Sequence, residues 1–362
     1  MEYLKLEDCC EILDSKRIPV TANKRRNGKY PYYGANGLQD YVDDYIFDDE
    51  LVLLAEDGGN FNSKDKPIAY RVSGKCWVNN HAHVLKPKQG ISVDYLCYAL
   101  MYYDVSGLVN GATRQKLTQA TMRKMKIPIL SEIDQLRIVE IMNSIQQLKN
   151  DYRSILHKLD VLIKARFIEM FGDPVADTKN WGQTLLKEHL ESIRYGTSTP
   201  PIFTDDGYAF IRATNIKNGK IVTNDMKYIP QEEADRLEKC KLSGGEIIIV
   251  RSGVNAGDTC VVTDEYIGQY AGYDMILVLS SDLHPVFFNT LINTEYMDKV
   301  VKPLTRRAAQ PHLNSEQTQR LPIIEVPFEL QEQFADFVKQ VDKSRFDIKK
   351  SITEIEREVV YD

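Results

Sequence analysis

The chain has 362 residues, with 46 Lys or Arg, 52 Asp or Glu, and a formal net charge of −6. This length fits two or three ordinary domains, and a hydrophobic share of 43% is enough for packed cores, which excludes global disorder. The negative total argues against a protein that coats nucleic acid by bulk charge, although it leaves room for a local basic face. No run of about 20 apolar residues is present, so no membrane span is expected.

The N-terminus and the cysteines point to a cytoplasmic protein. Residues 1–5 lack the apolar stretch of a secretory signal. The six cysteines contain no CxxC pair and two are adjacent, which suits neither a zinc site nor a disulfide framework. We therefore expect reduced thiols and no bound metal. The cysteines are Cys9, Cys10, Cys76, Cys97, Cys240 and Cys260.

The chain reads as two non-helical domains, each followed by a long helix. Residues 1–130 and 173–326 contain short apolar runs split by turn signals, a pattern that predicts mixed α/β domains with much strand. Residues 131–172 and 327–362 carry apolar residues at alternating spacings of three and four, which predicts two long helices that pair as an antiparallel coiled coil.

The helical seams can be written residue by residue. Arg345 is a polar break in the second seam, and the Gly-Asp-Pro sequence at 172–174 ends the first helix. The first seam is Ile138, Ile141, Ile145, Leu148, Tyr152, Ile155, Leu159 and Leu162, and the second is Phe334, Val338, Val341, Arg345, Ile348, Ile352, Ile355 and Val359.

An internal repeat organises the whole chain. Residues 117–135 and 313–331 lie 196 positions apart, and each contains an apolar-Pro-apolar-apolar block ahead of its long helix. The same offset pairs the apolar runs at 51–54 and 247–250, and a glycine-bearing loop follows each run. Two coincidences at one offset indicate a duplicated plan, in which two related domains are held apart by the helices.

Basic and polar residues gather at related positions of the two repeats. Residues 1–130 have a net charge of +2 and residues 181–326 a net charge of −4, yet short basic clusters stand just before Leu117 and Leu313. Arg, Lys, Asn and Gln at such positions suit phosphates and base edges, although each cluster alone could be a solvated surface. We expect phosphate anchoring by Lys24, Arg25, Lys116 and Arg306, and base contacts by Asn80, Arg114, Thr197, Arg212, Asn215, Arg251, Arg307 and Gln310.

Motifs of enzymes are missing from the sequence. No phosphate-binding or dinucleotide-binding glycine loop, no metal-binding His-Glu-x-x-His or Cys/His cluster and no Gly-x-Ser-x-Gly elbow is present. The Asn-Pro-Pro-aromatic tetrapeptide of amino-methyltransferases is also absent. We therefore expect a protein without a catalytic site of its own.

The arrangement resembles the DNA-specificity subunits of type I restriction-modification systems. The resemblance covers essentially the whole chain and is more specific in the second half, where residues 310–314 have no close match at residues 114–117. The segments that carry it are Gly196–Pro200, Phe210–Ile216, Gly245–Gly253, Gln310–Asn314, Leu321–Ile324, Pro327, Leu330–Gln331 and Phe171–Pro174.

The resemblance implies a fold and a function. Two target-recognition domains, 1–130 and 173–326, would each read one half of a bipartite asymmetric site in double-stranded DNA, in a pseudo-twofold arrangement. The conserved helices, 131–172 and 327–362, would set the unspecified spacer and dock two modification subunits, which are adenine-N6 methyltransferases that bring S-adenosylmethionine. Restriction subunits, where present, would use ATP and Mg²⁺, and this chain itself would bind no cofactor.

Two other classes of protein remain open at this point. A coiled-coil scaffold could use its domains to bind protein partners without DNA, which the negative net charge favours and the repeated basic loops oppose. An unrecognised nuclease or methyltransferase site is the second alternative, because loose carboxylate clusters leave no clear sequence pattern.

Overall fold

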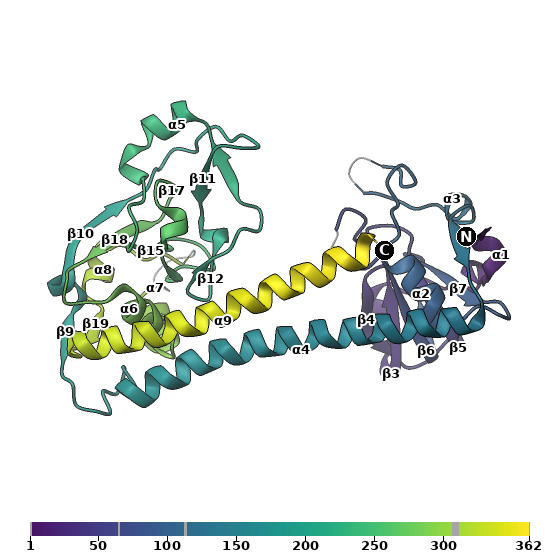
Figure 1. Ribbon diagram of the computed structural model, residues 1–362, viewed down its shortest axis with the longest axis horizontal. Helices are drawn as coiled ribbons and strands as arrows, with labels where there is room; N and C mark the ends of the chain where they lie inside the picture. Colours follow the sequence, from purple (N-terminus) through teal and green to yellow (C-terminus); the bar gives the residue numbers. More distant parts are fainter. Residues whose placement is uncertain (1, 64–65, 112–113, 306–310, 362) are drawn as a thin grey trace. The chain divides into compact units, whose positions relative to one another are not determined.

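The computed structural model describes residues 2–63, 66–111, 114–305 and 311–361, and it describes side chains in the last helix as far as residue 355. By contacts the chain divides into two compact units, Met1–Asn150 and Asp151–Asp362. Each unit is a mixed α/β structure, which confirms the predicted fold class (Figure 1). Over the described residues, no helix combines the length and the apolar character needed to cross a bilayer.

The first unit is built on a six-stranded sheet with the order β2-β7-β5-β6-β3-β4. Its neighbours are antiparallel except β3 and β6, which are parallel. A separate antiparallel pair, β1 with β8, joins the N-terminus to the segment before the long helix. The elements are β1 (Glu2–Lys5), α1 (Leu6–Cys9), β2 (Cys10–Ile12), β3 (Asn27–Gly34), β4 (Gly37–Val42), β5 (Phe47–Ala55), β6 (Ala69–Val78), β7 (Ala82–Pro87), α2 (Val93–Met101), α3 (Gln119–Met122) and β8 (Lys126–Ile129).

The second unit divides its strands among smaller sheets. Their orders are β10-β18-β15-β16, β14-β11-β17, β12-β13 and β19-β9. The elements are β9 (Gln183–Leu185), β10 (Leu190–Tyr195), β11 (Tyr208–Ile211), β12 (Ile216–Lys217), β13 (Lys220–Ile221), β14 (Lys227–Ile229), α5 (Gln231–Arg236), β15 (Ile247–Ile249), β16 (Thr259–Val261), β17 (Tyr270–Ala271), β18 (Met275–Leu279), α6 (Pro285–Ile292), α7 (Lys302–Thr305), α8 (Ser315–Gln319) and β19 (Pro322–Ile324).

The internal repeat is confirmed by the strand pairing. The apolar-Pro blocks form β8 and β19, each in an antiparallel pair. The apolar runs at 51–54 and 247–250 fall on β5 and β15, and each of these strands lies between two antiparallel neighbours. A short helix, α2 or α6, follows the strand next to β5 or β15, which is β7 in the first unit and β18 in the second. The repeated sequence pattern therefore corresponds to a repeated local structure in the two units.

One buried glutamine fastens each long helix to its own domain. Gln135 and Gln331 lie 196 positions apart, each is 2% exposed, and each side chain accepts one backbone N–H and donates to two carbonyls. The partners of Gln135 are the N–H of Ser92 (2.8 Å) and the carbonyls of Gly90 (2.9 Å) and Leu130 (3.1 Å), and those of Gln331 are the N–H of His284 (2.8 Å) and the carbonyls of Asp282 (3.1 Å) and Val326 (2.8 Å).

The long helices are α4 (Glu132–Phe171) and α9 (Phe328–Tyr361). The boundary between the compact units falls inside α4, between Asn150 and Asp151. Packing explains its position, because Val139 belongs to an apolar core of the first unit, whereas Ile163 and Phe167 belong to one of the second.

Within the second unit, α4 and α9 pack antiparallel. The ring of Phe334, near the start of α9, lies 5.5 Å from that of Phe167 and 5.6 Å from that of Phe171, near the end of α4. Farther along α9, Arg345 meets Asp160, which comes earlier in α4, at 2.5 Å. The chain directions of the two helices are therefore opposed.

The seam predicted for α4 is wrong at alternate positions of residues 151–171. Ile155 and Leu162, predicted in the seam, are 39% and 45% exposed, whereas Ile163 and Phe167 are buried. A straight α-helix repeats every 3.6 residues, so a 3.5-residue pattern drifts around its axis. The buried face therefore passes from the predicted row to the neighbouring one.

The polar break predicted in α9 is a buried charged group. Arg345 is 6% exposed and its guanidinium contacts the carboxylates of Asp160 and Asp342. Lys220, from the short hairpin of β12 and β13, reaches Asp342 at 3.1 Å. The two carboxylates are about half exposed, so these ion pairs add little net stability, but a single charged position in an apolar seam favours one register of the two helices.

All six cysteines are free and buried, as expected for reduced thiols. Burial raises the pKa of several of them, to about 12 for Cys10, Cys76 and Cys97. A thiol with so high a pKa is a poor nucleophile at neutral pH, so these side chains act as small apolar groups in the cores.

Candidate nucleic-acid interface

A matched pair of segments lies at the end of the central strand in each unit. The loop that follows β5 is hydrogen-bonded to the segment before Leu117, and the loop that follows β15 is bonded in the same way to the segment before Leu313. The matched links are Leu117 N–H to Glu56 O (2.7 Å) and Leu313 N–H to Arg251 O (2.8 Å), the bridges Asp57 with Lys116 and Ser252 with His312, and Gly58 N–H to Gln115 O (3.2 Å) and Gly253 N–H to Pro311 O (3.1 Å).

A glycine occupies the same place in both loops because the backbone requires it. Gly58 has φ of +62° and Gly253 has φ of +93°, in the left-handed region that side chains rarely adopt. We call each pair of segments, 56–58 with 115–117 and 251–253 with 311–313, a recognition frame. The two frames share their backbone links and differ in every side chain that they expose.

In the first frame, Asp57 holds two nitrogen-bearing side chains at the surface. Its Oδ1 lies 2.6 Å from Nη2 of Arg114 and 2.7 Å from Nδ1 of His81. The side chain of Arg114 is 60% exposed, so its guanidinium is both oriented and accessible. An oriented guanidinium is the group best suited to the O6 and N7 acceptors of guanine or to a phosphate.

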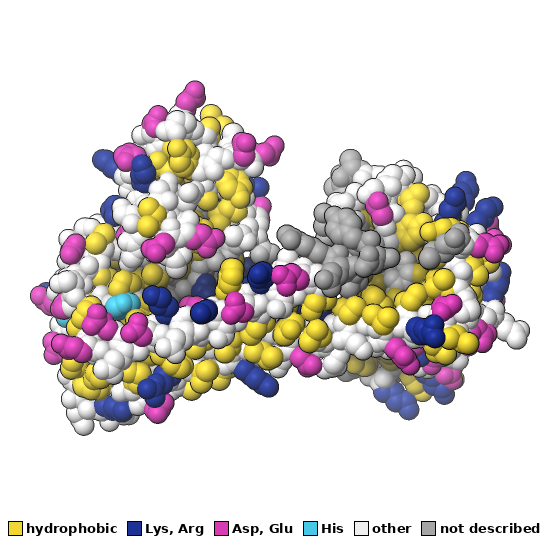
Figure 2. All heavy atoms as spheres, viewed as in Figure 1, with side chains coloured by type: hydrophobic (Ala, Val, Ile, Leu, Met, Phe, Trp, Pro, Cys, Tyr) yellow, Lys and Arg dark blue, Asp and Glu magenta, His cyan; other side chains and the backbone are white. Residues whose placement is uncertain are grey.

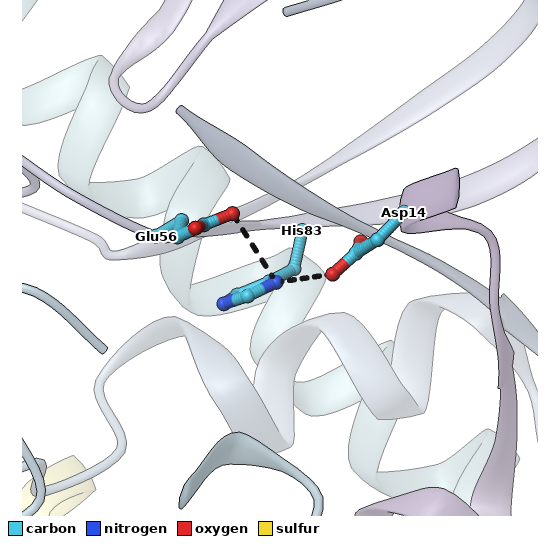
Figure 3. A group of neighbouring side chains, drawn as sticks. All are labelled: Asp14, Glu56 and His83. Carbon is cyan, nitrogen blue, oxygen red and sulfur yellow. Dashed lines mark hydrogen bonds and ion pairs between the residues drawn. The ribbon is translucent and has the colours of Figure 1, made fainter. Parts of the chain in front are cut away.

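A buried ion network lies behind the first frame (Figure 3). Nδ1 of His83 lies 2.6 Å from Asp14 and 3.7 Å from Glu56, and its Nε2 lies 2.9 Å from the carbonyl of Leu117. Glu56 also binds Arg17 at 2.6 Å. The network thus ties the loop after β5, the strand β7 and the Leu117 segment together.

The network is balanced by its own cations. Burial by itself would raise the pKa of the Asp14 and Glu56 carboxyls. Hydrogen bonds from His83 to Asp14, and from Arg17 and Lys116 to Glu56, outweigh burial, so the pKa of each carboxyl is lowered. The oxygens of Asp14, Glu56 and the ring of His83 lie close enough to suggest a metal site. Arg17 and Lys116 already occupy both oxygens of Glu56, and we therefore assign the cluster a structural role.

The second frame exposes a hydroxyl and an imidazole. Oγ of Ser252 lies 2.8 Å from Nδ1 of His312, and both side chains are exposed. Two residues after Ser252, Val254 is 95% exposed at the tip of the same loop. A hydroxyl, an imidazole and an apolar side chain together offer a donor, an acceptor and a surface for a methyl group.

Arg251 and Asp274 lie beneath the second frame. The guanidinium of Arg251 stacks 5.2 Å from the ring of Tyr195, and its backbone N–H donates to Oδ1 of Asp274 at 2.9 Å. Among the described residues, nothing bonds Nε of Arg251 or Oδ2 of Asp274, although both atoms are buried. Burial raises the pKa of Asp274, and the nearby Arg251 only partly offsets it. The buried polar atoms beneath the second frame therefore have fewer hydrogen-bond partners than those of the ion network behind the first.

Four residues predicted in the first domain to contact DNA lie on the described surface or near it. Lys24 and Asn80 are exposed, and Arg114 lies beside the first recognition frame, bonded to Asp57. Lys116 pairs with Glu56 at 2.9 Å and stays 48% exposed. These positions are compatible with the predicted contacts.

Arg25 is tied into its own domain. Its guanidinium stacks 4.1 Å from the ring of Tyr32, donates to the carbonyl of Val20 at 3.1 Å and pairs with Asp40 at 3.3 Å. Only 16% of its side chain is exposed. We therefore assign Arg25 first to holding its loop against the sheet, and the predicted phosphate contact stays a prediction.

The 210–216 segment of the second domain is more structural than expected. Asn215 is fully buried, and its amide bonds the N–H of Arg212 and the carbonyls of Val222 and Asn224. This burial argues against the predicted base contact, because no polar atom of the side chain is left for DNA. Arg212 itself pairs with Asp225 at 2.9 Å and is 20% exposed.

The remaining predicted residues of the second domain divide into two groups. Thr197 is partly exposed, but its hydroxyl bonds the backbone of Thr199. Arg251 lies under the second frame, as described above. Arg306, Arg307 and Gln310 lie outside the described residues.

Five side chains in or beside the frames were not predicted from the sequence, namely Asp57, His81, Ser252, Val254 and His312. Each stands in or beside a glycine or asparagine loop that the sequence does mark. The missing signal was the pairing of two distant segments, which only the fold brings together.

Comparison with known proteins identifies the family. The model of the type I restriction modification DNA specificity domain matches residues 1–157 and 190–357, once in each half. A putative type I restriction enzyme specificity subunit of Haemophilus influenzae is 35% identical over 151 residues, which span 42% of this chain but only 39% of that relative. The MjaVIII specificity subunit of Methanocaldococcus jannaschii is 20% identical, over 94% of this chain and 86% of its own length.

The fold agrees with a solved structure of the same kind. The S subunit of a type I restriction-modification system from M. genitalium has a TM-score of 0.54 at 13% identity, covering 99% of this chain and 93% of that one. The likeness supports the fold, and the duplicated match of the family model accounts for the internal repeat. The chain therefore belongs to the type I restriction modification DNA specificity family.

Proposed function

We propose that this chain is the sequence-reading subunit of a type I restriction-modification complex and recognises double-stranded DNA. Each unit reads one half of a bipartite asymmetric site through its recognition frame, and α4 and α9 set the unread spacer. The observation that carries this proposal is the pair of frames, in which one backbone arrangement presents Asp57, His81 and Arg114 in one unit and Ser252 and His312 in the other. Two readers with different chemistry require two different half-sites.

Two modification subunits would dock on the long helices and bring S-adenosylmethionine, and restriction subunits, where present, would use ATP and Mg²⁺. This chain would supply no catalytic group and bind no cofactor itself. Exposed apolar side chains on α4 support a protein partner there, and Figure 2 shows such side chains along this helix. Those within residues 151–171 are Ile155, Val161, Leu162 and Ile168.

Sequencing of N6-methyladenine in cells that express this chain with its modification subunit tests the proposal. The expected result is one bipartite, non-palindromic motif with a fixed spacer, which disappears when this chain is omitted. Methylation without a motif, or an unchanged motif in the absence of this chain, would contradict sequence reading.

A second measurement separates this function from the alternatives. The pure chain, incubated with plasmid, Mg²⁺ and S-adenosylmethionine, is expected to give neither cleavage nor methylation. Product formation by the chain alone would identify an enzyme. Failure to shift duplex DNA at low salt, even with modification subunits present, would identify a protein scaffold instead.

A further inference from the structure

We propose that Ser252, Val254 and His312 form the base-reading surface of the second unit, and that Val254 packs against the methyl group of a thymine. This inference rests on the function proposed above and adds to it the residues and the kind of base involved.

Position in the fold is the first argument. Ser252 and His312 face each other across the second recognition frame, at the places that Asp57 and Lys116 occupy in the first. In the first unit, Asp57 of this frame orients the exposed guanidinium of Arg114. If the two units read DNA with the same part of the fold, Ser252 and His312 are the second unit's readers.

Exposure without a structural reason is the second argument. Val254 is 95% exposed, so it contributes nothing to a core. An apolar side chain in this position contributes stabilising free energy only when a partner buries it. The C5 methyl of thymine is the apolar group that base pairs present in the major groove. Ser252, two residues away, carries a hydroxyl that can donate to or accept from a base edge.

Rigidity is the third argument, because a reader must be held in place. The loop closes on itself through Ala256 N–H to the carbonyl of Gly253 at 3.0 Å and Asp258 N–H to that of Asn255 at 2.9 Å. The bond between Ser252 and His312 fixes the two polar side chains against each other. Val254 thus projects from a loop whose backbone is already ordered.

The two units then read different chemistry. Arg114 of the first unit suits the acceptors of guanine, whereas the second surface suits a base pair that contains thymine. Variants in one frame should therefore alter one half-site and leave the other unchanged.

The thymine contact is tested with DNA duplexes that contain the motif identified by methylation sequencing. In these duplexes each thymine of one half-site is replaced in turn by deoxyuridine, which lacks the methyl group. With the full complex, one replacement should weaken binding by roughly fourfold, the worth of one buried methyl. Val254→Ala should bind the thymine and uracil duplexes equally. Ile267→Ala is the control, because Ile267 is also exposed (50%) but lies in a different turn of the same unit.

The polar readers are tested by the methylated motif itself. Ser252→Ala and His312→Ala should each relax one or two positions of a single half-site, with losses of roughly five- to a hundredfold at those positions, and Arg114→Ala should relax the other half-site. Ser252→Thr, which keeps the hydroxyl, should retain the motif.

Several outcomes would overturn the inference while the proposed function survives. They are an unchanged motif in both alanine variants, weakening that is uniform over all sequences as for a phosphate contact, or equal sensitivity of Val254→Ala and the wild type to uracil. Absence of any motif with the wild-type chain would instead refute the proposed function.

Discussion

The two recognition frames have the same backbone links but opposite charge at one position. Glu56 follows β5, and its backbone carbonyl accepts a hydrogen bond from the N–H of Leu117. Arg251 follows β15, and its carbonyl accepts one from the N–H of Leu313. Around Glu56 the first unit gathers cations, whereas around Arg251 the second unit places one buried carboxylate, Asp274.

This difference shows which part of the fold is constrained. Backbone bonds, the left-handed glycines and the buried leucines at 117 and 313 recur, because without them the two segments would not meet. Side chains at the frame do not recur, so each unit solves its own charge balance. Under the proposed function, a chain built this way can change the reading of one half-site without disturbing the other.

The largest expected effect comes from breaking the network of the first unit. Asp14→Ala removes the partner of His83 and of the Val84 N–H, and it leaves a buried histidine beside Glu56. Loss of one member of a buried ion network costs about 3–5 kcal/mol of unfolding free energy. Hydrogen exchange measured by mass spectrometry should show the loss in peptides of residues 1–150 and not in those of residues 151–362.

Asp49→Ala is the matched control in the same unit. Asp49 pairs with Lys86 at 2.6 Å, but both side chains are more than one third exposed, so a change of at most about 1 kcal/mol is expected. Equal losses in the two variants would mean that the buried network contributes no more than a surface pair.

The next effect tests whether the two units are equivalent where their side chains do recur. Gln135→Ala and Gln331→Ala each remove three hydrogen bonds and leave one buried N–H without its acceptor, which costs about 2–3 kcal/mol. Both losses should be of similar size, and each should appear in the exchange of its own unit. Unequal losses of unfolding free energy would show that the two glutamines do not contribute equally to attaching the long helices.

Gln340→Ala serves as the control for the glutamines, because Gln340 is an exposed residue of α9. Its replacement should change the unfolding free energy by less than about 0.5 kcal/mol.

The sequence carried the local information well. The repeat at an offset of 196, the two long helices and the blocks that form β8 and β19 were all predicted, because periodicity and prolines act over short distances. The charged loop before Leu117 was also found, and its Lys116 forms part of the first frame. The charged residues predicted before Leu313 lie outside the described residues.

Contacts between distant segments were beyond the sequence. The bond of Ser252 to His312 spans 60 residues and that of Asp57 to Arg114 spans 57, so neither leaves a local pattern. The structure argues against the base contact predicted for Asn215 for a different reason. Its neighbours look like a polar loop, but its amide satisfies buried backbone groups of the turn.

The smallest expected effect has the opposite sign and separates the charge balance of the two units. Asp274 is 4% exposed and its Oδ2 finds no partner among the described residues, so its ionised form is costly. Asp274→Asn keeps the acceptor for the Arg251 N–H. It should stabilise the second unit at pH 7 by about 1 kcal/mol, because a neutral amide avoids the desolvation cost of the buried charge.

The pH dependence tells whether this reason is correct. Burial raises the pKa of Asp274 in the folded chain, so the wild type carries the full penalty above that pKa and is relieved of it as the pH falls toward the unfolded value of about 3.9. The advantage of Asp274→Asn should therefore shrink on acidification. Asp14 has a lowered pKa, so its stabilisation is lost only as the pH falls below about 4. If Asp274→Asn instead destabilises residues 151–362 at pH 7, attraction between Arg251 and Asp274 outweighs the cost of burial, and both frames are held by ion pairs.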